Sequence, residues 1–537
     1  QGDSWTAISP DLSTDNPEWQ RQMKSGGLTY DVTGAENFTT IYDIAPSPVE
    51  EGVIWAGTDD GQLHVTRNGG TTWTNVIDNV EGIPEHTWVQ QIRASKFEAG
   101  AAYVVFDDHR RANWTPYVYR TTNYGEDWTR IVGPEDVDGF ALSIVQDPVA
   151  QDLLFLGTQY GLYFSIDGGE NWTQWTHDYP TAQTRDLAIQ ERERDLVVGT
   201  FGRSAYVLDD IQPFRALAQQ GPDVLRDTMR VFQAPTAHLM EQGTHIGAHT
   251  GGQAVFEGEN EPSGAMLTYN VTRPDTSEVA NPPKEVTIHI TDTAGDTVRT
   301  FHGLAEEGLN RTTWGLSRTG VRQPGTSQAE AERRDGEPSG PQVTPGRYTA
   351  HISYRGHSDS TMVQVRPDPR LDGTMTEAER EARQALYDRL MARTETATNA
   401  ADRIRAAQRT IANVMSQLEG RADSTAAEAR PKGRAMADSL DSLLHAFVPK
   451  EYEGIVDDPT LVSSRLGQVG FYLGTEGDGP TDTERIVLER AEQRLRVALD
   501  RVNAFFQEDW PAFKRAVEEA NPSFFDEHEP IEMEAMN

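Results

Sequence analysis

The sequence predicts a multidomain, mainly β protein, in which a partial β-propeller is followed by an immunoglobulin-like β-sandwich and then by an α-helical bundle or hairpin. Three observations support this fold class. An eight-residue pattern that ends in tryptophan occurs three times before residue 173, short runs alternate apolar and polar residues up to about residue 365, and apolar residues recur at helical spacing from Met375 onward. The 537 residues are enough for two to four domains.

The tryptophan pattern reads hydroxyl, x, Asp or Asn, x, Gly, x, x, Trp. A short Asp or Asn side chain bonds back to nearby backbone N–H groups, and glycine accepts a positive φ, so the pattern predicts a tight hairpin. The tryptophan is expected to fold over the turn and bury its ring. The residues with these structural roles are Thr66, Asn68, Gly70, Trp73, Thr121, Asn123, Gly125, Trp128, Ser165, Asp167, Gly169 and Trp172. Three copies in register predict a β-propeller and leave its chemistry open.

Repeated strands between these hairpins indicate successive blades. Runs that end in Gly-Thr recur at Val53–Thr58, Leu154–Thr158 and Leu196–Thr200. The last two runs are 42 residues apart, and a four-stranded blade needs about 40–50 residues. We therefore expect about four blades between residues 41 and 210, within a propeller domain of residues 1–212. Residues 2–5 read as the second half of another hairpin, which predicts the C-terminal part of a larger propeller.

A linker and a second β region are predicted after this domain. Residues 213–235 read as a linker with one short helix. In residues 236–370, Val286 to Ile290 alternate apolar and polar side chains, which predicts a half-buried strand. Several such short strands favour an immunoglobulin-like sandwich. Residues 321–341 are rich in Gly, Pro, Ser and charge, and so predict a mobile insertion.

Residues 371–520 are predicted to be helical. Thr376 with Glu379, and Thr481 with Glu484, have the spacing of capping boxes at helix starts. Apolar residues then recur at three- and four-residue intervals, which predicts a small antiparallel bundle or a long hairpin. These apolar stripes favour a core over a binding groove. Residues 521–537 are predicted to be an acidic tail.

The composition is acidic and contains no cysteine. Asp and Glu number 84 against 48 Lys and Arg, which gives a net charge of −36. Such a charge repels nucleic acid and anionic membranes, and no apolar run reaches membrane-spanning length, so neither a nucleic-acid partner nor a membrane span is expected. The absence of cysteine excludes disulfides, thiolate zinc sites and a cysteine nucleophile. The acidity fits either a salt-adapted organism or an acidic surface encoded by a GC-rich genome.

The hairpin pattern is the Asp-box of bacterial-neuraminidase-type (BNR) repeats, and residues 1–210 resemble the Asp-box propellers of sortilin-type (Vps10) domains, sialidases and xyloglucanase-type glycosidases. The chain is most similar to a bacterial group called "glycosyl hydrolase, BNR repeat" or sortilin-like. In that group a Gly-Thr-x-Gly-Arg strand, here Gly199–Asp210, closes the propeller, and a Pro-Gly-x-Tyr strand, here Pro345–Tyr348, follows in a sandwich. The sandwich also resembles that of flagellar hook-capping proteins. The resemblance implies a secreted, periplasmic or cell-surface bacterial protein, and says more about architecture than about activity.

Candidate site residues follow from this geometry. If the hairpins lie between the third and fourth strands of each blade, the loops after the second strand project from the opposite face, where a ligand site is expected. A glycosidase needs a carboxylic acid and a carboxylate about 5–10 Å apart. The eligible carboxylates on that face are Asp59, Asp60, Asp107 and Asp108. The candidates for a ligand-binding rim are His109, Tyr160, Phe201 and Arg203.

Two functions stay open at this point. One is an extracytoplasmic protein that binds a peptide or a carbohydrate on that face, docks to a partner through its sandwich and helices, and has its propeller completed by a partner chain or an upstream half. The other is a glycoside hydrolase with a carboxylate pair. A sialidase would also need an arginine cluster for the substrate carboxylate and a tyrosine nucleophile. Arg203 and Tyr160 are present, but three converging arginines cannot be assembled from the sequence. No cofactor and no metal are expected, because His238, His245 and His249 lie in a glycine-rich loop.

Overall fold

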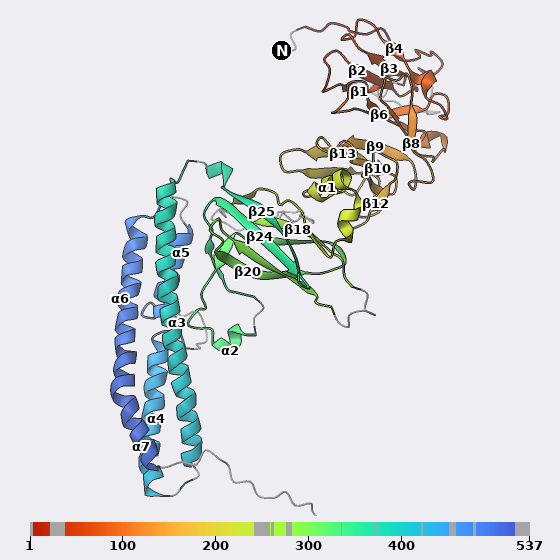
Figure 1. The fold of residues 1–537 in the computed structure, drawn as a ribbon. Helices are drawn as coiled ribbons and strands as arrows, with labels where there is room; N and C mark the ends of the chain where they lie inside the picture. Colours follow the sequence, from red (N-terminus) through yellow and green to blue (C-terminus); the bar gives the residue numbers. More distant parts are fainter. Residues whose placement is uncertain are drawn as a thin grey trace, which may run out of the picture. The chain divides into compact units, whose positions relative to one another are not determined.

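The computed structural model describes residues 4–21, 38–240, 258, 262–274, 282–333, 336–371, 373–419, 421, 423–450, 458–475 and 479–520 (Figure 1). The chain forms two compact units. Unit 1 comprises residues 1–235, 268–282 and 306–310, and unit 2 comprises residues 236–267, 283–305 and 311–537. The described part of the chain is mainly β, with its long helices in the C-terminal region. None of the helices in that part is long and apolar enough to cross a membrane.

Unit 1 begins with four antiparallel sheets, in each of which the strands are neighbours in sequence order. The second strands of the first three sheets are buried along most of their length. The first sheet holds β1 (Ile41–Pro46), β2 (Ile54–Thr58), β3 (Leu63–Thr66) and β4 (Thr74–Asn75), and the second holds β5 (Trp88–Ala94), β6 (Ala102–Asp107), β7 (Tyr117–Thr121) and β8 (Thr129–Val132). The third holds β9 (Ala141–Gln146), β10 (Leu154–Thr158), β11 (Gly161–Ser165) and β12 (Thr173–Trp175), and the fourth holds β13 (Thr184–Gln190), β14 (Asp195–Thr200) and β15 (Ala205–Leu208).

The four sheets are arranged as blades. The first strand of each sheet packs against the first two strands of the sheet before it. Each first strand carries a bulge at the same point, at Tyr42, Gln90, Leu142 and Arg185. The side chain of Gln91 accepts a hydrogen bond from Ile144 N in the third sheet at 2.7 Å, and its Nε2 donates to Asp186 Oδ1 in the fourth sheet at 3.1 Å. First strands that converge on one axis in this way are the arrangement of a β-propeller, as the sequence predicts.

The three tryptophan hairpins form the same bonds. In the first, the amide of Gly70 donates to Thr66 Oγ1 at 3.0 Å, and the amide of Thr72 donates to Asn68 Oδ1 at 2.9 Å. Equivalent bonds of 2.9–3.0 Å occur in the other two hairpins. The final glycines have φ values of +92°, +83° and +98°, which is the conformation that requires glycine. The hairpins therefore adopt the geometry predicted from their residue types, between the third and fourth strands.

The tryptophans tie neighbouring blades together. Trp172 Nε1 donates to the carbonyl of Ile131 in β8 at 2.9 Å, and Trp73 Nε1 donates to the carbonyl of Ile8 at 3.0 Å. Ile8 thus takes the place beside the first sheet that Ile131 takes beside the third. Trp128 packs edge-on against Trp55, with ring centroids 5.9 Å apart. Trp128 and Trp172 thus each join two sheets, and Trp73 joins the first sheet to the segment that precedes it, where the sequence predicted burial against one blade.

Residues 213–235, predicted as a linker with one short helix, contain such a helix and pack within unit 1. This segment contains most of α1 (Gln212–Gln220), a 3₁₀ turn at Pro222–Arg226 and β16 (Met229–Val231). Phe214 of α1 packs against Phe155, Phe164 and Trp175, with ring centroids 4.9–5.7 Å apart. The helix forms because its apolar face has a hydrophobic cluster of the third and fourth sheets to cover.

The second β region forms further sheets. A five-stranded sheet has the order β17 (Ala237–Leu239), β25 (His357–Pro367), β24 (Gly346–Tyr354), β19 (Glu285–Thr291) and β20 (Thr297–Leu304). A three-stranded sheet holds β16, β18 (Ala265–Val271) and β21 (Gly308–Trp314), and β22 (Ser317–Thr319) pairs with β23 (Ser339–Gln342). Val286, Ile288 and Ile290 are fully buried on one face of β19, as their alternation predicts. An immunoglobulin-like topology for this region stays a prediction.

The insertion predicted to be mobile, residues 321–341, is held by hydrogen bonds where the structure describes it. Arg322 forms an ion pair with Asp402, and its carbonyl accepts a bond of 2.6 Å from Thr398 Oγ1. The insertion also contains α2 (Gln328–Ala331), which Ser327 caps, and part of β23. The composition of this segment predicted mobility. The contacts that hold it come from a helix more than 70 residues away, and composition does not reveal such contacts.

The helical region of unit 2 consists of α3 (Glu377–Glu419), α4 (Ser424–His445), α5 (Val462–Thr475), α6 (Asp482–Ala504) and α7 (Trp510–Ala520), with a π-helical turn at Phe505–Asp509 (Figure 1). Helix α3 packs against α4, α5 and α6 around one hydrophobic core. Both capping boxes are present: Thr376 N donates to Glu379 Oε2 at 2.7 Å, and Thr481 N donates to Glu484 Oε2 at 2.8 Å. The predicted apolar stripes form the core of this bundle.

Candidate functional site

The loops that follow the second strands lie at the end of unit 1 opposite the tryptophan hairpins, because adjacent strands in each blade are antiparallel. A repeated backbone bond closes this end. The amides of Asp59, Gln159 and Phe201 each donate to the residue just before the first strand of their own sheet, at 2.8–3.1 Å. The candidate residues of the first, second, third and fourth sheets therefore share one face, which is called the loop face below.

Asp59 and Asp60 are buried and bonded to neighbouring chain segments. Asp59 accepts hydrogen bonds from the amide and hydroxyl of Thr40 at 2.8 and 3.2 Å, and burial raises the pKa of its carboxyl group although these bonds oppose the shift. Asp60 accepts a bond of 2.7 Å from the amide of Thr14 and a second bond from the hydroxyl of Thr58. Both carboxylates fasten loops of the first blade.

Asp107 and Asp108 are also buried, and they fix the loop after β6. Asp107 accepts hydrogen bonds from the amide of His109 at 3.0 Å, from its Nδ1 at 2.6 Å and from Arg110 Nη1 at 3.0 Å. Asp108 accepts a bond of 2.9 Å from Asn113 Nδ2 and forms an ion pair with Arg111. The carboxylates of Asp107 and Asp108 thus both hold the 3₁₀ turn at His109–Arg111 in place.

These bonds place two side chains of the turn on aromatic rings. The His109 ring stacks on Phe140, with centroids 4.5 Å apart and planes inclined by 8°, and Trp114 lies 5.8 Å from the same ring. On the other side, the Arg110 guanidinium lies 3.9 Å above the ring of Trp88. We call the row of Trp114, Phe140, His109, Arg110, Trp88 and Tyr42 the aromatic strip, in which Tyr42 packs edge-on against Trp88 at 4.9 Å.

The strip has a buried base and an accessible surface. Phe140 is only 2% exposed, whereas Trp114 and Tyr42 are 54% and 44% exposed. Large aromatic surfaces held in fixed orientations lose little conformational entropy when a ligand covers them. Of the strip, the sequence prediction included only His109. The other four rings come from four separate loops and strand starts, and Trp114 on the loop after β6 was the one available signal.

The remaining rim candidates lie on the loops of the third and fourth sheets. Tyr160 is 48% exposed, Phe201 is 72% exposed, and Arg203 is also exposed. Among the described residues, no aromatic ring contact joins Tyr160 or Phe201 to the aromatic strip. Of the predicted histidine cluster, His238 lies in β17, and His245 and His249 fall outside the described residues.

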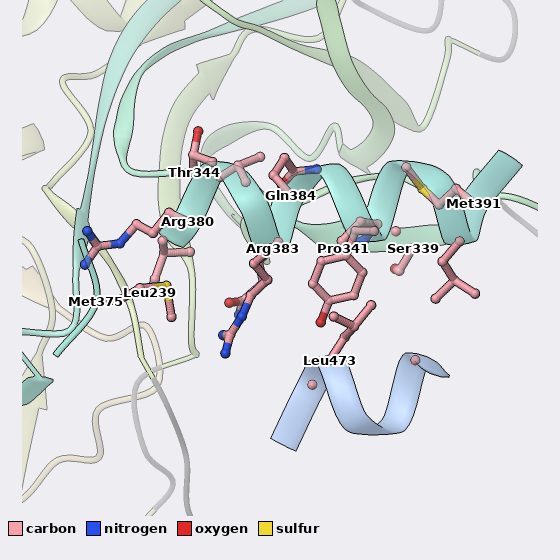
Figure 2. A pocket seen from close by; sticks show the side chains of 18 of the residues that line it. Leu239, Ser339, Pro341, Thr344, Met375, Arg380, Arg383, Gln384, Met391 and Leu473 are labelled. Atoms are coloured by element: carbon pink, nitrogen blue, oxygen red, sulfur yellow. The ribbon is translucent and has the colours of Figure 1, made fainter. Parts of the chain in front are cut away.

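A second concave site lies in unit 2, and no sequence pattern pointed to it. A cavity of about 960 Å³ is enclosed by one face of α3, one face of α5 and the segments around β22, β23 and the end of β25. Figure 2 shows Arg380 and Arg383 toward one end of this cavity and Met391 toward the other, with Leu473 of α5 facing α3.

No protein-family model matches the chain, and no curated protein matches it. Among solved structures, a structure of YCF48 bound to D1 peptide aligns with 51% of this chain and 78% of its own, at 13% identity and a TM-score of 0.24. The GH74 xyloglucanase of Xanthomonas campestris (10% identity, TM-score 0.26) and the GH74 enzyme of Niastella koreensis (14%, 0.27) align with 60% and 62% of this chain. The chain spans only 58% and 51% of those two proteins. With such TM-scores, these similarities carry no argument about function.

Proposed function

We propose that this chain is an extracytoplasmic binding protein whose propeller takes up a peptide or glycan ligand on the aromatic strip of the loop face. The sandwich and the helices then act as docking modules for a partner. The observation that carries the proposal is the strip itself. Trp114 and His109 pack on the buried ring of Phe140, and His109 and Arg110 are bonded to the buried carboxylate of Asp107, so these groups are oriented before any ligand arrives.

The chemistry of the strip suits flat or apolar ligand groups. Exposed Trp and Tyr rings stack on sugar rings and on apolar or aromatic peptide side chains, and such anchors contribute most of the affinity in many binding sites. Arg110 and His109 add hydrogen-bond donors at the centre of the strip. Because both are bonded to Asp107, their directions are fixed, which favours recognition of one orientation of the ligand.

The state of the acidic residues supports binding over hydrolysis. A glycoside hydrolase needs two carboxyl groups that face each other across the substrate. Asp59, Asp60, Asp107 and Asp108 are at most 5% exposed, and all of them accept hydrogen bonds from the protein itself. Carboxylates bonded in this way hold loops together. No specific observation favours the glycosidase alternative.

The test is ligand binding with matched variants of the purified chain. Peptide and polysaccharide arrays would first identify which ligand class binds, and affinity would then be measured by calorimetry. We expect Trp114→Ala to weaken binding about tenfold or more, as for an aromatic anchor. Trp5→Ala is the control, because Trp5 is 92% exposed and is not one of the residues of the aromatic strip. Equal affinities of the two variants would refute the proposed strip.

A hydrolysis assay on the same polysaccharides separates the two functions. We expect no product to be released by the wild-type chain. Turnover that disappears in Asp59→Asn or Asp108→Asn, while the folding of these variants is unchanged, would contradict the binding proposal and favour the hydrolase.

A further inference from the structure

The first sheet of unit 1 exposes apolar side chains at positions that are buried in the other sheets. In the second, third and fourth sheets, the residue two positions after the bulge packs in the hydrophobic cluster shared with the sheet before it. These residues are Ile92, Ile144 and Leu187, and all are at most 2% exposed. Ile44, at the same position in β1, is 57% exposed, and Ile41, just before the bulge, is 41% exposed. The first sheet thus presents the surface with which a blade packs on a preceding blade.

The fourth sheet presents the other half of this interface. Gly57, Gly157 and Gly199 occupy equivalent positions in the second strands, opposite the residue that follows the bulge. A Cβ atom at Gly57 would lie 2.3 Å from Val89 Cγ1 in the second sheet, and one at Gly157 would lie 2.7 Å from Thr184 Cγ2 in the fourth. For a Cβ at Gly199, the three nearest atoms belong to its own sheet, at 3.6–3.9 Å. Among the described residues, Gly199 therefore lacks the close neighbour from a following sheet that the other two glycines have.

The fourth sheet also has an uncovered outer edge. Among the described strands, β15 pairs only with β14, and Val207 of β15 is exposed. The segment Trp5–Ile8 lies in the place of the fourth strand of a preceding sheet, because Ile8 accepts a bond from the tryptophan of the first hairpin as β8 does from that of the third. Its sequence, Trp-Thr-Ala-Ile, differs only at its third residue from that of Trp128–Ile131, which leads into β8. One chain thus holds both a sheet that lacks a fourth strand and a segment suited to supply one.

A hydrogen-bond acceptor is repeated on the fourth sheet. Asp43, just after the bulge of β1, accepts Ile44 N through Oδ1 at 3.0 Å and Ile92 N of the second sheet through Oδ2 at 2.6 Å. Asp186 is the equivalent residue of β13, and its Oδ1 accepts Leu187 N at 2.9 Å. The side chain of Asp186 is largely exposed, and its Oδ2 accepts no hydrogen bond from the described residues. The oxygen that joins the first sheet to the second therefore has an unused counterpart on the fourth.

We propose that two copies of this chain associate, with the first sheet of each packed on the fourth sheet of the other. The contact repeats the one that joins successive sheets within a chain. It brings Ile41 against Gly199, the Ile44 amide to Asp186 Oδ2, and Trp5–Ile8 beside β15 as an added strand. A second copy is the favoured partner because both halves of the interface are present in one chain. The pair holds eight such sheets, and propellers typically have four to eight blades, so the two heterologous contacts close one ring.

The experiment measures the mass of the full chain in solution by sedimentation velocity at micromolar concentrations. We expect twice the mass of one chain. Gly199→Val should give single chains with an unchanged melting temperature, because a Cβ at this position meets no atom of its own chain closer than 3.6 Å. Ile44→Asp should weaken the association about tenfold or more, because it places a charge in the contact. Val49→Asp is the matched control and should associate like the wild type, since its equivalent Val149 is exposed although the third sheet has neighbours on both sides.

A disulfide can identify the facing residues, because the chain has no cysteine of its own. Ile41→Cys chains mixed with Gly199→Cys chains should form a cross-linked pair under oxidising conditions, which neither variant should form alone. The equivalent residues within one chain, Val89 and Gly57, are adjacent, so the two sulfur atoms come within reach of each other.

Several results would overturn the proposal. They are the mass of a single chain for the wild type, association that survives Gly199→Val in a folded variant, and a disulfide within one chain of the Ile41→Cys/Gly199→Cys double variant, which would show four sheets closing on themselves. Trp114→Ala should associate like the wild type, so the result is independent of the function proposed for the loop face.

Discussion

The ion pair between Arg215 and Asp147 fastens α1 to the third blade. Because both side chains are buried, the loss of folding stability on removing either partner can be worked out. The two side chains are 4% and 0% exposed. Arg215 Nε donates to both carboxylate oxygens of Asp147, at 3.1 and 2.9 Å. The backbone amides of Val149 and Ala150 donate to the same carboxylate, at 2.8 and 2.7 Å. Four donor contacts thus converge on one buried anion.

The two single variants should differ in cost. Removal of one partner of a buried ion pair costs about 3–5 kcal/mol, because the other charge stays buried without its counter-ion. Arg215→Met leaves the carboxylate with its two amide donors, so we expect a loss near 3 kcal/mol. Asp147→Ala leaves a buried guanidinium and two amides without an acceptor, and each unsatisfied group adds about 1 kcal/mol or more, so we expect about 5 kcal/mol. The double variant should cost less than the sum.

Hydrogen exchange of the α1 amides under native conditions is the suitable assay, because a chain of two units does not unfold in a single two-state step. Fluorescence of Trp175 gives a second signal, since its ring lies 5.3 Å from that of Phe214 on the same helix. A loss below 1 kcal/mol for Arg215→Met would refute the reasoning. So would an Asp147→Ala variant that is no less stable than Arg215→Met.

Three further predictions test the hairpins, the bundle and the loop face. Gly69→Ala should cost about 1 kcal/mol for its positive φ, whereas Gly70→Ala should cost at least twice as much in urea unfolding, because its Cβ would overlap a backbone carbonyl. Hydrogen bonding to Arg389 lowers the pKa of Glu492 to about 2, so this ion pair stabilises the bundle above pH 4.5. In acid unfolding, about 1–2 kcal/mol of stability should be lost as the pH falls from 4.5 to 2, and this loss should be absent from Glu492→Gln. Asp107→Asn should lower ligand affinity without a change in the circular dichroism spectrum, because two side chains of the strip lose their charged acceptor.

The hairpins could be predicted from the sequence because every bond that shapes them is local. Thr66, Asn68 and Gly70 form their turn within five residues, and the same residue types form the same turn twice more. The capping boxes of the helices are local in the same sense. Features of this kind are determined by residue type and spacing alone, so they are readable without an alignment.

Contacts between distant segments could not be predicted in this way. Arg215 and Asp147 are 68 residues apart, and without that pairing α1 reads as part of a linker. The acidic candidates show the same limit of sequence-based prediction. In the sequence, an Asp on a loop that faces solvent cannot be distinguished from one that, like Asp60, accepts a hydrogen bond from Thr14.

Ligand binding on the loop face should depend little on salt, because the cations of the aromatic strip are bonded to a buried carboxylate. On the loop face, His109 and Arg110 are both bonded to Asp107, whose side chain is fully buried. A ligand that stacks on this strip meets little net charge. Its affinity should therefore change less than twofold between 50 and 500 mM NaCl, although the Debye length falls from about 14 Å to about 4 Å over this range. A severalfold change in affinity over this range would contradict this account of the charges on the loop face.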